Sequence, residues 1–190
     1  VNLAGSKSVA ECENNPDAAY QINVAGVRNV SRLAKRYNIR FIHLSTDMIF
    51  DGKKGNYSEN DAPCPMTVYA KTKYQGEEAA LSLGTNTLIL RSALCFGMPL
   101  GKNHSFSDWL ESGFTKSKKM NLFKDQYRTP VYVRDLCRLV AKCIPSKLTG
   151  ILHAAGDDKV DRVEFARIYA KARGIQRKVH KCCRIEQSKI

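Results

Sequence analysis

The sequence predicts an α/β fold in which a parallel sheet is covered by helices on both faces. Short apolar segments rich in Ile and Leu alternate along the chain with longer segments whose apolar residues recur at helical spacing. The first pattern is typical of buried strands and the second of amphipathic helices. Their alternation indicates a doubly wound sheet, because neighbouring parallel strands are usually joined through helices.

The first half of the chain contributes three strand segments and two helices. Residues 1–4 are predicted to be the end of a strand, and apolar residues at helical spacing predict a helix over residues 16–37. The next strand is predicted at residues 41–44. A helix over residues 69–83 and a buried strand at residues 87–90 complete this half.

The second half continues the alternation after a predicted loop at residues 97–103. A helix that ends near Pro145 is predicted at residues 133–143, and one that ends at Gly174 is predicted at residues 162–172. Proline and glycine are typical residues just beyond a helix. The remaining elements are a helix at residues 104–115 and a short strand at residues 151–154.

Composition places the chain among ordinary globular proteins. Its 190 residues are 43% hydrophobic, which is enough to bury a core, and no apolar segment is long enough to span a membrane. No signal-peptide pattern opens the chain, so we expect a cytoplasmic protein with no membrane partner. The seven cysteines lack the spacing of a zinc site or a disulfide framework, so we expect reduced thiols and no metal.

The net charge of +13 has three explanations. A solvated basic surface is favoured over attraction of a nucleotide diphosphate, and nucleic-acid binding comes third. Aromatic residues do not interleave with the denser basic stretches at 116–119 and 173–189, and no nucleic-acid motif accompanies them. We therefore expect no nucleic-acid partner.

Tyr69 and Lys73 are the candidate catalytic pair. Because they lie four residues apart in a predicted helix, the phenol and the ammonium share one face. A nearby cation favours the phenolate, so Lys73 is expected to lower the pKa of Tyr69 toward the working pH. A tyrosine tuned in this way can act as an acid or a base. Thr46, which follows an apolar strand, can present a third polar group beside the pair.

Three stretches of the chain carry a resemblance to a known family. The first joins LSTDMIFDG (44–52), Tyr57, Glu59 and two prolines to VYAKTK (68–73). The others are DQYRTPVYVRDL (125–136) and GILHAAG (150–156) with EFA (164–166). In order and spacing the chain resembles the extended short-chain dehydrogenase/reductases, and among them the dTDP-4-dehydrorhamnose reductase group, over residues 1–174.

The resemblance implies a Rossmann-type fold that is truncated at its N-terminus. Residues 1–97 would form the C-terminal part of an NAD(P)-binding domain. Residues 98–190 would be mostly a small substrate-binding lobe, with segments that return to the sheet. The glycine-rich phosphate turn of this fold is not found in the sequence, so we expect a partial chain that lacks roughly the first 60 residues and binds no dinucleotide tightly.

The activity that the resemblance implies is reduction of a 4-keto group on a nucleotide-activated sugar, with NADPH or NADH as cofactor. Tyr69 would donate a proton to the ketone oxygen, and Thr46 would hydrogen-bond the same oxygen. Lys73 would bind the nicotinamide ribose. Asp47 is expected to contact the sugar, and Arg128 is expected to contact the diphosphate.

Small and polar residues near the switch point of the sheet would line the cofactor. Asn23 matches a family asparagine that supports the active-site backbone. Glycine and alanine let a dinucleotide approach the main chain. The cofactor-binding residues expected from the resemblance are Ala4, Gly5, Ser6, Asn23, Ser45, Tyr69, Lys73 and Ser92.

Each of these roles has a simpler alternative. Tyr69 could be a half-buried helix residue with Lys73 in solvent. Thr46 could only cap a turn, and Arg128 could only pair with an aspartate on the following helix. His43 lies in the middle of a predicted strand, so we expect a packed core histidine rather than a base.

Met48 and Leu94 depart from the pattern of the reductase group. Both stand where that group usually has an aromatic residue facing the sugar. The loss of two stacking surfaces leaves the reaction type intact and leaves the identity of the sugar open.

Two other functions remain open. The beta regulatory subunit of methionine adenosyltransferase has the same fold and a similar Tyr-x-x-x-Lys run, so the partner could be an adenosyltransferase catalytic subunit. A nucleotide-sugar epimerase uses the same tyrosine and lysine with NAD, whereas Met48 after Asp47 argues against a dehydratase. In the favoured interpretation the partner is a nucleotide-sugar substrate, and a homodimer is a further expectation.

Overall fold

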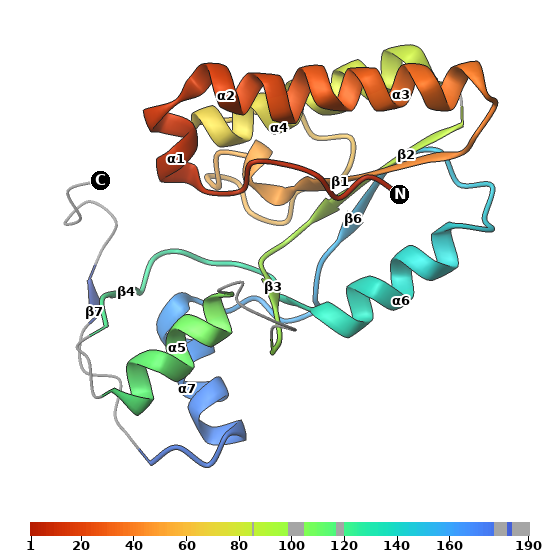
Figure 1. The fold of residues 1–190 in the computed structure, drawn as a ribbon. Coiled ribbons are helices and arrows are strands. Elements are labelled where there is room, and N and C mark those ends of the chain that lie inside the picture. The colour runs from red at the N-terminus through yellow and green to blue at the C-terminus, as the bar shows by residue number, and fades with distance from the viewer. Residues whose placement is uncertain (85, 99–104, 117–119, 177–181, 184–190) are drawn as a thin grey trace. The chain divides into compact units, whose positions relative to one another are not determined.

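The computed structural model describes residues 1–84, 86–98, 105–116, 120–176 and 182–183 (Figure 1). The chain divides into two compact units. The first comprises Val1–Ala93 and Arg138–Ala154, and the second comprises Leu94–Cys137 and Ala155–Ile190. The chain therefore leaves the first unit after Ala93 and returns to it for one helix end and one strand.

The first unit is built on a parallel sheet of three strands in the order β1-β2-β6. The strands are β1 (Phe41–Thr46), β2 (Thr87–Ser92) and β6 (Gly150–Ala154). Thr46 pairs with Ser92, and Ser92 pairs with Ala154, so the three strands end at the same edge. The predicted parallel sheet is confirmed.

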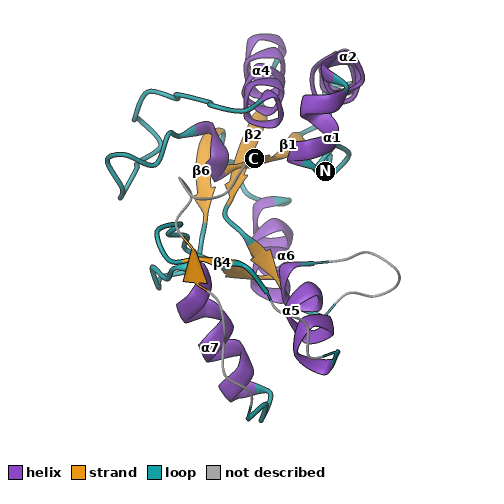
Figure 2. Cartoon of the chain, turned by 90° about the vertical axis from the view of Figure 1, so that its left-hand side faces the viewer, coloured by secondary structure: helices purple, strands orange, loops and turns teal. Residues whose placement is uncertain are grey.

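Different helices bury the two faces of this sheet, because successive side chains of a strand point to opposite sides. One face packs against α3 (Val27–Arg36) and α4 (Val68–Leu83). The opposite face packs against the end of α6 (Val133–Cys143). Figure 2 shows α2 and α4 on the same side of β1 and β2. The buried residues of the first face are Val27, Ala34, Phe41, Ala80 and Ile89, and those of the second are Ile42, Leu88, Leu90 and Cys143.

Of the strand end predicted at residues 1–4, only Asn2 pairs with the sheet. Asn2 forms an isolated parallel bridge with His43. The Asn2 N–H donates to the Ile42 carbonyl at 2.7 Å, and the Asn2 carbonyl accepts the Leu44 N–H at 3.1 Å. Ala4 is exposed, so the chain leaves the sheet soon after Asn2.

The helix predicted over residues 16–37 is continuous but not regular. It consists of α2 (Pro16–Tyr20), a π-helical segment η1 (Gln21–Gly26) and α3. At Gly76 of α4, an added Cβ would lie 2.3 Å from the Asn23 carbonyl oxygen, so η1 and α4 are in direct backbone contact. The predicted helix is confirmed, but its π-helical turn was not predicted, because apolar spacing does not reveal one wider turn. The short helix α1 (Val9–Asn14), which the Ser8 side chain caps, was not predicted.

Helix α4 begins at Val68, directly after its N-cap residue Thr67. The Thr67 side chain accepts the Ala70 N–H, which satisfies a backbone donor of the first turn. The helix predicted at residues 69–83 is therefore confirmed, with one more residue at its start. The strands β1 and β2 each extend two residues beyond their predicted ends, through Thr46 and Ser92.

The second unit has its own apolar core between α5 (Phe106–Thr115) and α7 (Arg162–Ala172). Its strands are two residues long, and β3 (Cys95–Phe96) pairs with β5 (Val131–Tyr132) while β4 (Leu122–Phe123) pairs with β7 (Cys182–Cys183). Gly174 follows α7 with a φ of +66°, as predicted for a closing glycine. His104 and most of the predicted loop at 97–103 lie outside the described residues. The buried core residues are Leu110, Phe114, Met120, Leu122, Val160, Val163, Phe165, Ala166 and Ala170.

Candidate active site

The carboxyl ends of β1 and β2 bring three predicted site residues to one edge. Ser45 and Thr46 are the last residues of β1, and Ser92 is the last residue of β2. All three are buried. Helix α4 packs against β1 and carries Tyr69 in its first turn and Lys73 one turn later. Open α/β sheets bind their ligands at this edge.

Thr46 caps a turn and also contacts the candidate acid. Its Oγ1 accepts the Met48 N–H at 3.2 Å, which caps the 3-10 turn η2 (Asp47–Ile49). The same hydroxyl lies 3.4 Å from Asp47 Oδ1. The Thr46 side chain also forms a hydrogen bond with the Tyr69 phenol. The capping role and the active-site role of Thr46 are therefore compatible.

The pKa of Tyr69 lies above its ordinary value, mainly because the phenol is buried. The bond to Thr46 lowers this pKa, and the carboxylate of Asp47 raises it further. The prediction that Lys73 lowers the pKa of Tyr69 is wrong for this structure, because burial dominates and the lysine amine is directed at the sheet. The phenol consequently holds its proton at neutral pH, as a proton donor must.

Lys73 reaches the backbone of β1 rather than solvent, with 5% of its surface exposed. Its Nζ donates to the Leu44 carbonyl at 2.7 Å and lies 3.4 Å from His43 Nε2. Burial lowers the pKa of Lys73 to about 8, and the negative charge of Glu77 acts in the opposite direction. The alternative of a solvated lysine is excluded.

Asn23 connects the N-terminal segment to α4. Its side-chain amide accepts the Ser6 N–H at 2.8 Å and donates to the Ser6 carbonyl at 3.2 Å. The amide also donates to Thr72 Oγ1 on α4 at 3.0 Å. Asn23 therefore fixes the backbone at Ser6, and its role beside a cofactor stays a prediction.

The segment of Ala4, Gly5 and Ser6 presents small residues beside Lys73. At Gly5, an added Cβ would lie 3.2 Å from Asn23 Oδ1 and 3.8 Å from Lys73 Nζ. Ser45 Oγ is buried and has no hydrogen-bond partner among the residues that the structure describes. An open backbone, a buried amine and an unused hydroxyl suit the nicotinamide ribose end of a dinucleotide. The residues present thus fit the expected cofactor.

A buried ion pair ties α4 to β2 behind these groups. Arg91 Nη2 lies 2.9 Å from Glu77 Oε2, and Arg91 Nε lies 3.1 Å from the same oxygen. Both side chains are at most 3% exposed. The Arg91 guanidinium also lies over the Phe50 ring, 5.5 Å from its centroid. Glu77 follows Lys73 by one turn of α4. The ion pair between Glu77 and Arg91 therefore helps to fix the position of α4, and with it Lys73, against the sheet.

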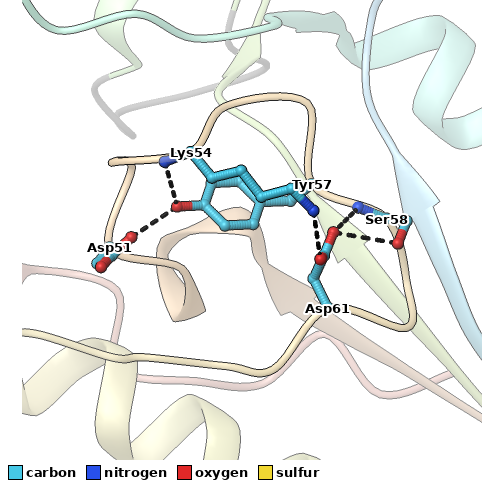
Figure 3. A network of polar contacts seen from close by, with 5 residues as sticks. All are labelled: Asp51, Lys54, Tyr57, Ser58 and Asp61. Carbon is cyan, nitrogen blue, oxygen red and sulfur yellow. Dashed lines mark hydrogen bonds and ion pairs between the residues drawn. The ribbon is translucent and has the colours of Figure 1, made fainter.

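The loop that follows β1 is cross-linked by its own polar side chains (Figure 3). The Tyr57 hydroxyl donates to Asp51 Oδ1 at 2.6 Å and accepts the Lys54 N–H at 3.0 Å. Asp61 accepts the Ser58 N–H at 2.7 Å and forms an ion pair with Lys54. Two motif residues, Asp51 and Tyr57, thus take part in a network that cross-links the loop over residues 51–61.

Asp47 and Arg128 belong to different units. Asp47 follows Thr46 in η2, and Arg128 forms an isolated antiparallel bridge with Val160 through two backbone bonds of 2.9 Å. Contact of either residue with a substrate stays a prediction. Ser92 Oγ donates to the Ala93 carbonyl at 3.0 Å, so its role toward a cofactor also stays a prediction.

His43 is fully buried, as predicted for a core histidine, but its contacts near the site and the residues Asn2 and Cys12 were missed from the sequence. Asn2 contacts His43, and His43 contacts Lys73. Cys12 is buried and its Sγ lies 3.3 Å from Ser6 Oγ. No local pattern could have found the first two contacts, because they join residues 41 and 30 positions apart.

Two kinds of site are not found within the described part of the chain. None of its helices has both the length and the apolar character that a membrane crossing needs. None of its His, Cys, Asp and Glu side chains gather in a group of three that could hold a metal ion.

Sequence comparison places the chain beside known reductases. The family model described as RmlD substrate binding domain matches residues 1–189. The dTDP-4-dehydrorhamnose reductase of Aggregatibacter actinomycetemcomitans is 33% identical over 176 residues, which cover 87% of this chain and 58% of that protein. Methionine adenosyltransferase 2 subunit beta of Pongo abelii is 29% identical over 178 residues, which cover 90% of this chain and 53% of that protein. The chain spans little more than half the length of these curated relatives.

Comparison with solved structures also finds a dTDP-4-dehydrorhamnose reductase. The dTDP-4-dehydrorhamnose reductase of Bacillus anthracis, in complex with NADP, superposes with a TM-score of 0.89 at 25% identity. The match covers 97% of this chain and 65% of that chain. The parallel α/β fold described above is therefore shared with a solved reductase.

Proposed function

The chain belongs to the RmlD substrate binding domain family, and we propose that the protein it forms reduces a 4-keto group on a nucleotide-activated sugar with NAD(P)H. One observation carries the proposal. Thr46 and Tyr69 are hydrogen-bonded to each other at the ligand-binding edge of the sheet, and Lys73 is buried one helical turn further on. The relatives named as dTDP-4-dehydrorhamnose reductases support this reaction class.

In the proposed reaction, Tyr69 donates its proton to the ketone oxygen. The raised pKa of the phenol keeps that proton in place until the oxygen gains negative charge. The Thr46 hydroxyl hydrogen-bonds the same oxygen and orients it, since Thr46 already contacts Tyr69. Asp47, which follows Thr46 in η2, contacts the sugar. Arg128 contacts the diphosphate as a bidentate donor.

Gly5, Ser45 and Lys73 would hold the nicotinamide ribose of the cofactor. Gly5 lets the ribose approach the backbone, Ser45 offers an unused buried hydroxyl, and Lys73 offers a donor. When bound, NADPH or NADH supplies the hydride for the sugar carbon. NADP in the Bacillus anthracis relative makes NADPH the first cofactor to test.

The test is an assay of NADPH oxidation by the purified complete protein with dTDP-4-dehydrorhamnose. We expect oxidation that requires the sugar and stops when the sugar is omitted. Because Met48 and Leu94 replace expected aromatic residues, the assay should include other 4-keto nucleotide sugars. The proposal fails if none of these sugars supports oxidation of NADPH or NADH.

A second candidate function is regulatory binding to a methionine adenosyltransferase. It is favoured by the 29% identity to methionine adenosyltransferase 2 subunit beta. Size-exclusion chromatography with an adenosyltransferase catalytic subunit separates the two functions. Co-elution without reductase activity supports the regulatory role, and reductase activity without co-elution supports the enzyme.

A further inference from the structure

The short helix α1 connects the N-terminal segment to the start of α4. Cys12 is fully buried in α1, and its Sγ lies 3.3 Å from Ser6 Oγ. One residue further along α1, Glu13 Oε1 accepts the Val68 N–H at 2.8 Å. Val68 is the first residue of α4. Two consecutive side chains of α1 therefore contact the segment expected to line the cofactor and the helix expected to carry the catalytic pair.

The bond from Glu13 reaches the turn that carries the candidate proton donor. Tyr69 directly follows Val68 in that turn, and its phenol forms a hydrogen bond with Thr46. The pKa of Tyr69 is raised mainly by burial, and Cys12 is among the smaller causes of the rise, so α1 lies near the phenol. A movement of this turn would therefore move the phenol relative to Thr46.

The bond from Glu13 is additional to the local cap of α4. The Thr67 side chain accepts the Ala70 N–H and supplies that cap. Glu13 satisfies a different N–H, at the first helical position, from 55 positions away in the chain. The bond therefore fixes the first turn of α4 to a separate segment of the protein.

Helix α1 is itself held at both ends. The Ser8 side chain accepts the Glu11 N–H at its start, and the Asn15 side chain, directly after its end, caps α2. Asn23 holds both backbone groups of Ser6. Ser6, α1 and the first turn of α4 are thus joined by contacts that all lie in the first unit.

We propose that Glu13 is a positioning residue that holds the first turn of α4, and with it the Tyr69 phenol, in the place from which the proton is donated. This inference rests on the proposed function, because it assigns Glu13 an effect on proton transfer in the reduction. In this role Glu13 touches neither the sugar nor the cofactor and acts through the Val68 N–H.

The test separates the reach of the Glu13 side chain from its charge. In the complete protein, Glu13→Gln keeps an oxygen acceptor at the same reach and loses the charge, whereas Glu13→Asp keeps the charge and is one methylene shorter. Glu13→Ala loses both. We expect kcat to fall by about tenfold in Glu13→Ala and Glu13→Asp, and to stay within about twofold of the wild type in Glu13→Gln.

The effect should be confined to kcat. The KM for the sugar and the dissociation constant of NADPH should change by less than about twofold, because Asn23 still holds Ser6. Glu11→Ala is the matched control, since it removes a carboxylate from the same helix. The Glu11 side chain is exposed and, within the described part of the chain, forms no hydrogen bond or ion pair. We expect this control to keep the wild-type kcat.

A second readout follows the phenol without turnover. In NMR spectra of the complete protein with isotope-labelled tyrosine, the Tyr69 ring resonance can be assigned through Tyr69→Phe. We expect this resonance to shift in Glu13→Ala and Glu13→Asp and to keep its position in Glu13→Gln and Glu11→Ala. A loss of global stability alone does not give this pattern at a temperature at which every variant is folded.

The outcomes are distinct. A kcat within about twofold of the wild type in both Glu13→Ala and Glu13→Asp would overturn the inference, and so would an equal loss in Glu11→Ala. Retained kcat in Glu13→Asp with a loss in Glu13→Gln would also overturn it, because charge rather than reach would then matter. If the wild type reduces no 4-keto nucleotide sugar, the proposed function fails. The Tyr69 resonance then decides the role of Glu13, and an unshifted resonance in Glu13→Ala and Glu13→Asp rejects it.

Discussion

Asn23 holds the backbone of Ser6 from both sides, with its Oδ1 2.8 Å from the Ser6 nitrogen and its Nδ2 3.2 Å from the Ser6 carbonyl oxygen. The same Nδ2 donates to Thr72 on α4. Asn23 is fully buried in the π-helical segment. One amide therefore connects the segment at residues 4–6 with the helix that carries Tyr69 and Lys73.

Replacement of Asn23 by alanine should destabilise the protein. The change leaves the Ser6 N–H and carbonyl without their partner, at a cost of about 2–3 kcal/mol. Urea unfolding measures the loss, and Asn60→Ala, at an exposed position, should change stability by less than about 0.5 kcal/mol. Equal stability of the two variants would contradict the bridging role.

In the complete protein, replacement of Tyr69 by phenylalanine should abolish the proposed reduction. The change removes the proton donor, so we expect kcat to fall by about 10²–10⁴-fold while cofactor binding is kept. Tyr74→Phe, on the same helix, is the control and should retain activity. Turnover by Tyr69→Phe at the wild-type rate would rule out the mechanism.

His43 should make the protein less stable in mildly acidic solution. Burial lowers its pKa from 6.5 to about 3, so between these values the unfolded chain binds a proton that the folded chain does not. The stabilising contribution is present above pH 6.5 and is lost as the pH falls toward 3. Between pH 7 and pH 5, we expect wild-type stability to fall by about 2 kcal/mol more than that of His43→Gln. Urea unfolding at the two pH values checks this, and parallel losses would speak against it.

The pair of Glu77 and Arg91 should be sensitive to removal of one partner. Glu77→Ala leaves a buried guanidinium uncompensated, at a cost of about 3–5 kcal/mol. The double variant Glu77→Leu, Arg91→Met should recover part of this loss, because both charges are removed. Lys54→Ala breaks a more exposed pair and should have a much smaller effect on thermal unfolding. The explanation fails if the double variant is less stable than Glu77→Ala.

Tyr57 should control the order of the loop after β1. In Tyr57→Phe, the Lys54 N–H and the Asp51 carboxylate lose their shared hydroxyl. The bond to Tyr57 is the main cause of the lowered Asp51 pKa, so that pKa should rise toward its ordinary value. Hydrogen exchange at the Lys54 amide should become faster. NMR detects both changes, and Tyr127→Phe in the second unit should produce neither.

Long elements with local signals were predictable, and short elements that depend on distant partners were not. The helix at Val133–Cys143 was predicted with its full bounds, and α7 was predicted with its closing glycine. The strands β3 and β5 are two residues long and exist only because they pair with each other. The π-helical turn at Asn23 likewise depends on the close approach of Gly76 from α4.

By itself, the sequence determined the alternation of strands and helices and the order of Thr46, Tyr69 and Lys73 along it, because spacing along the chain carries that information. Only the tertiary structure decided the direction of the Tyr69 pKa and the partners of the Lys73 amine. Both depend on burial and on contacts of Lys73 with Leu44 and His43. Such contacts form between segments far apart in the chain, and no local pattern of residues encodes them.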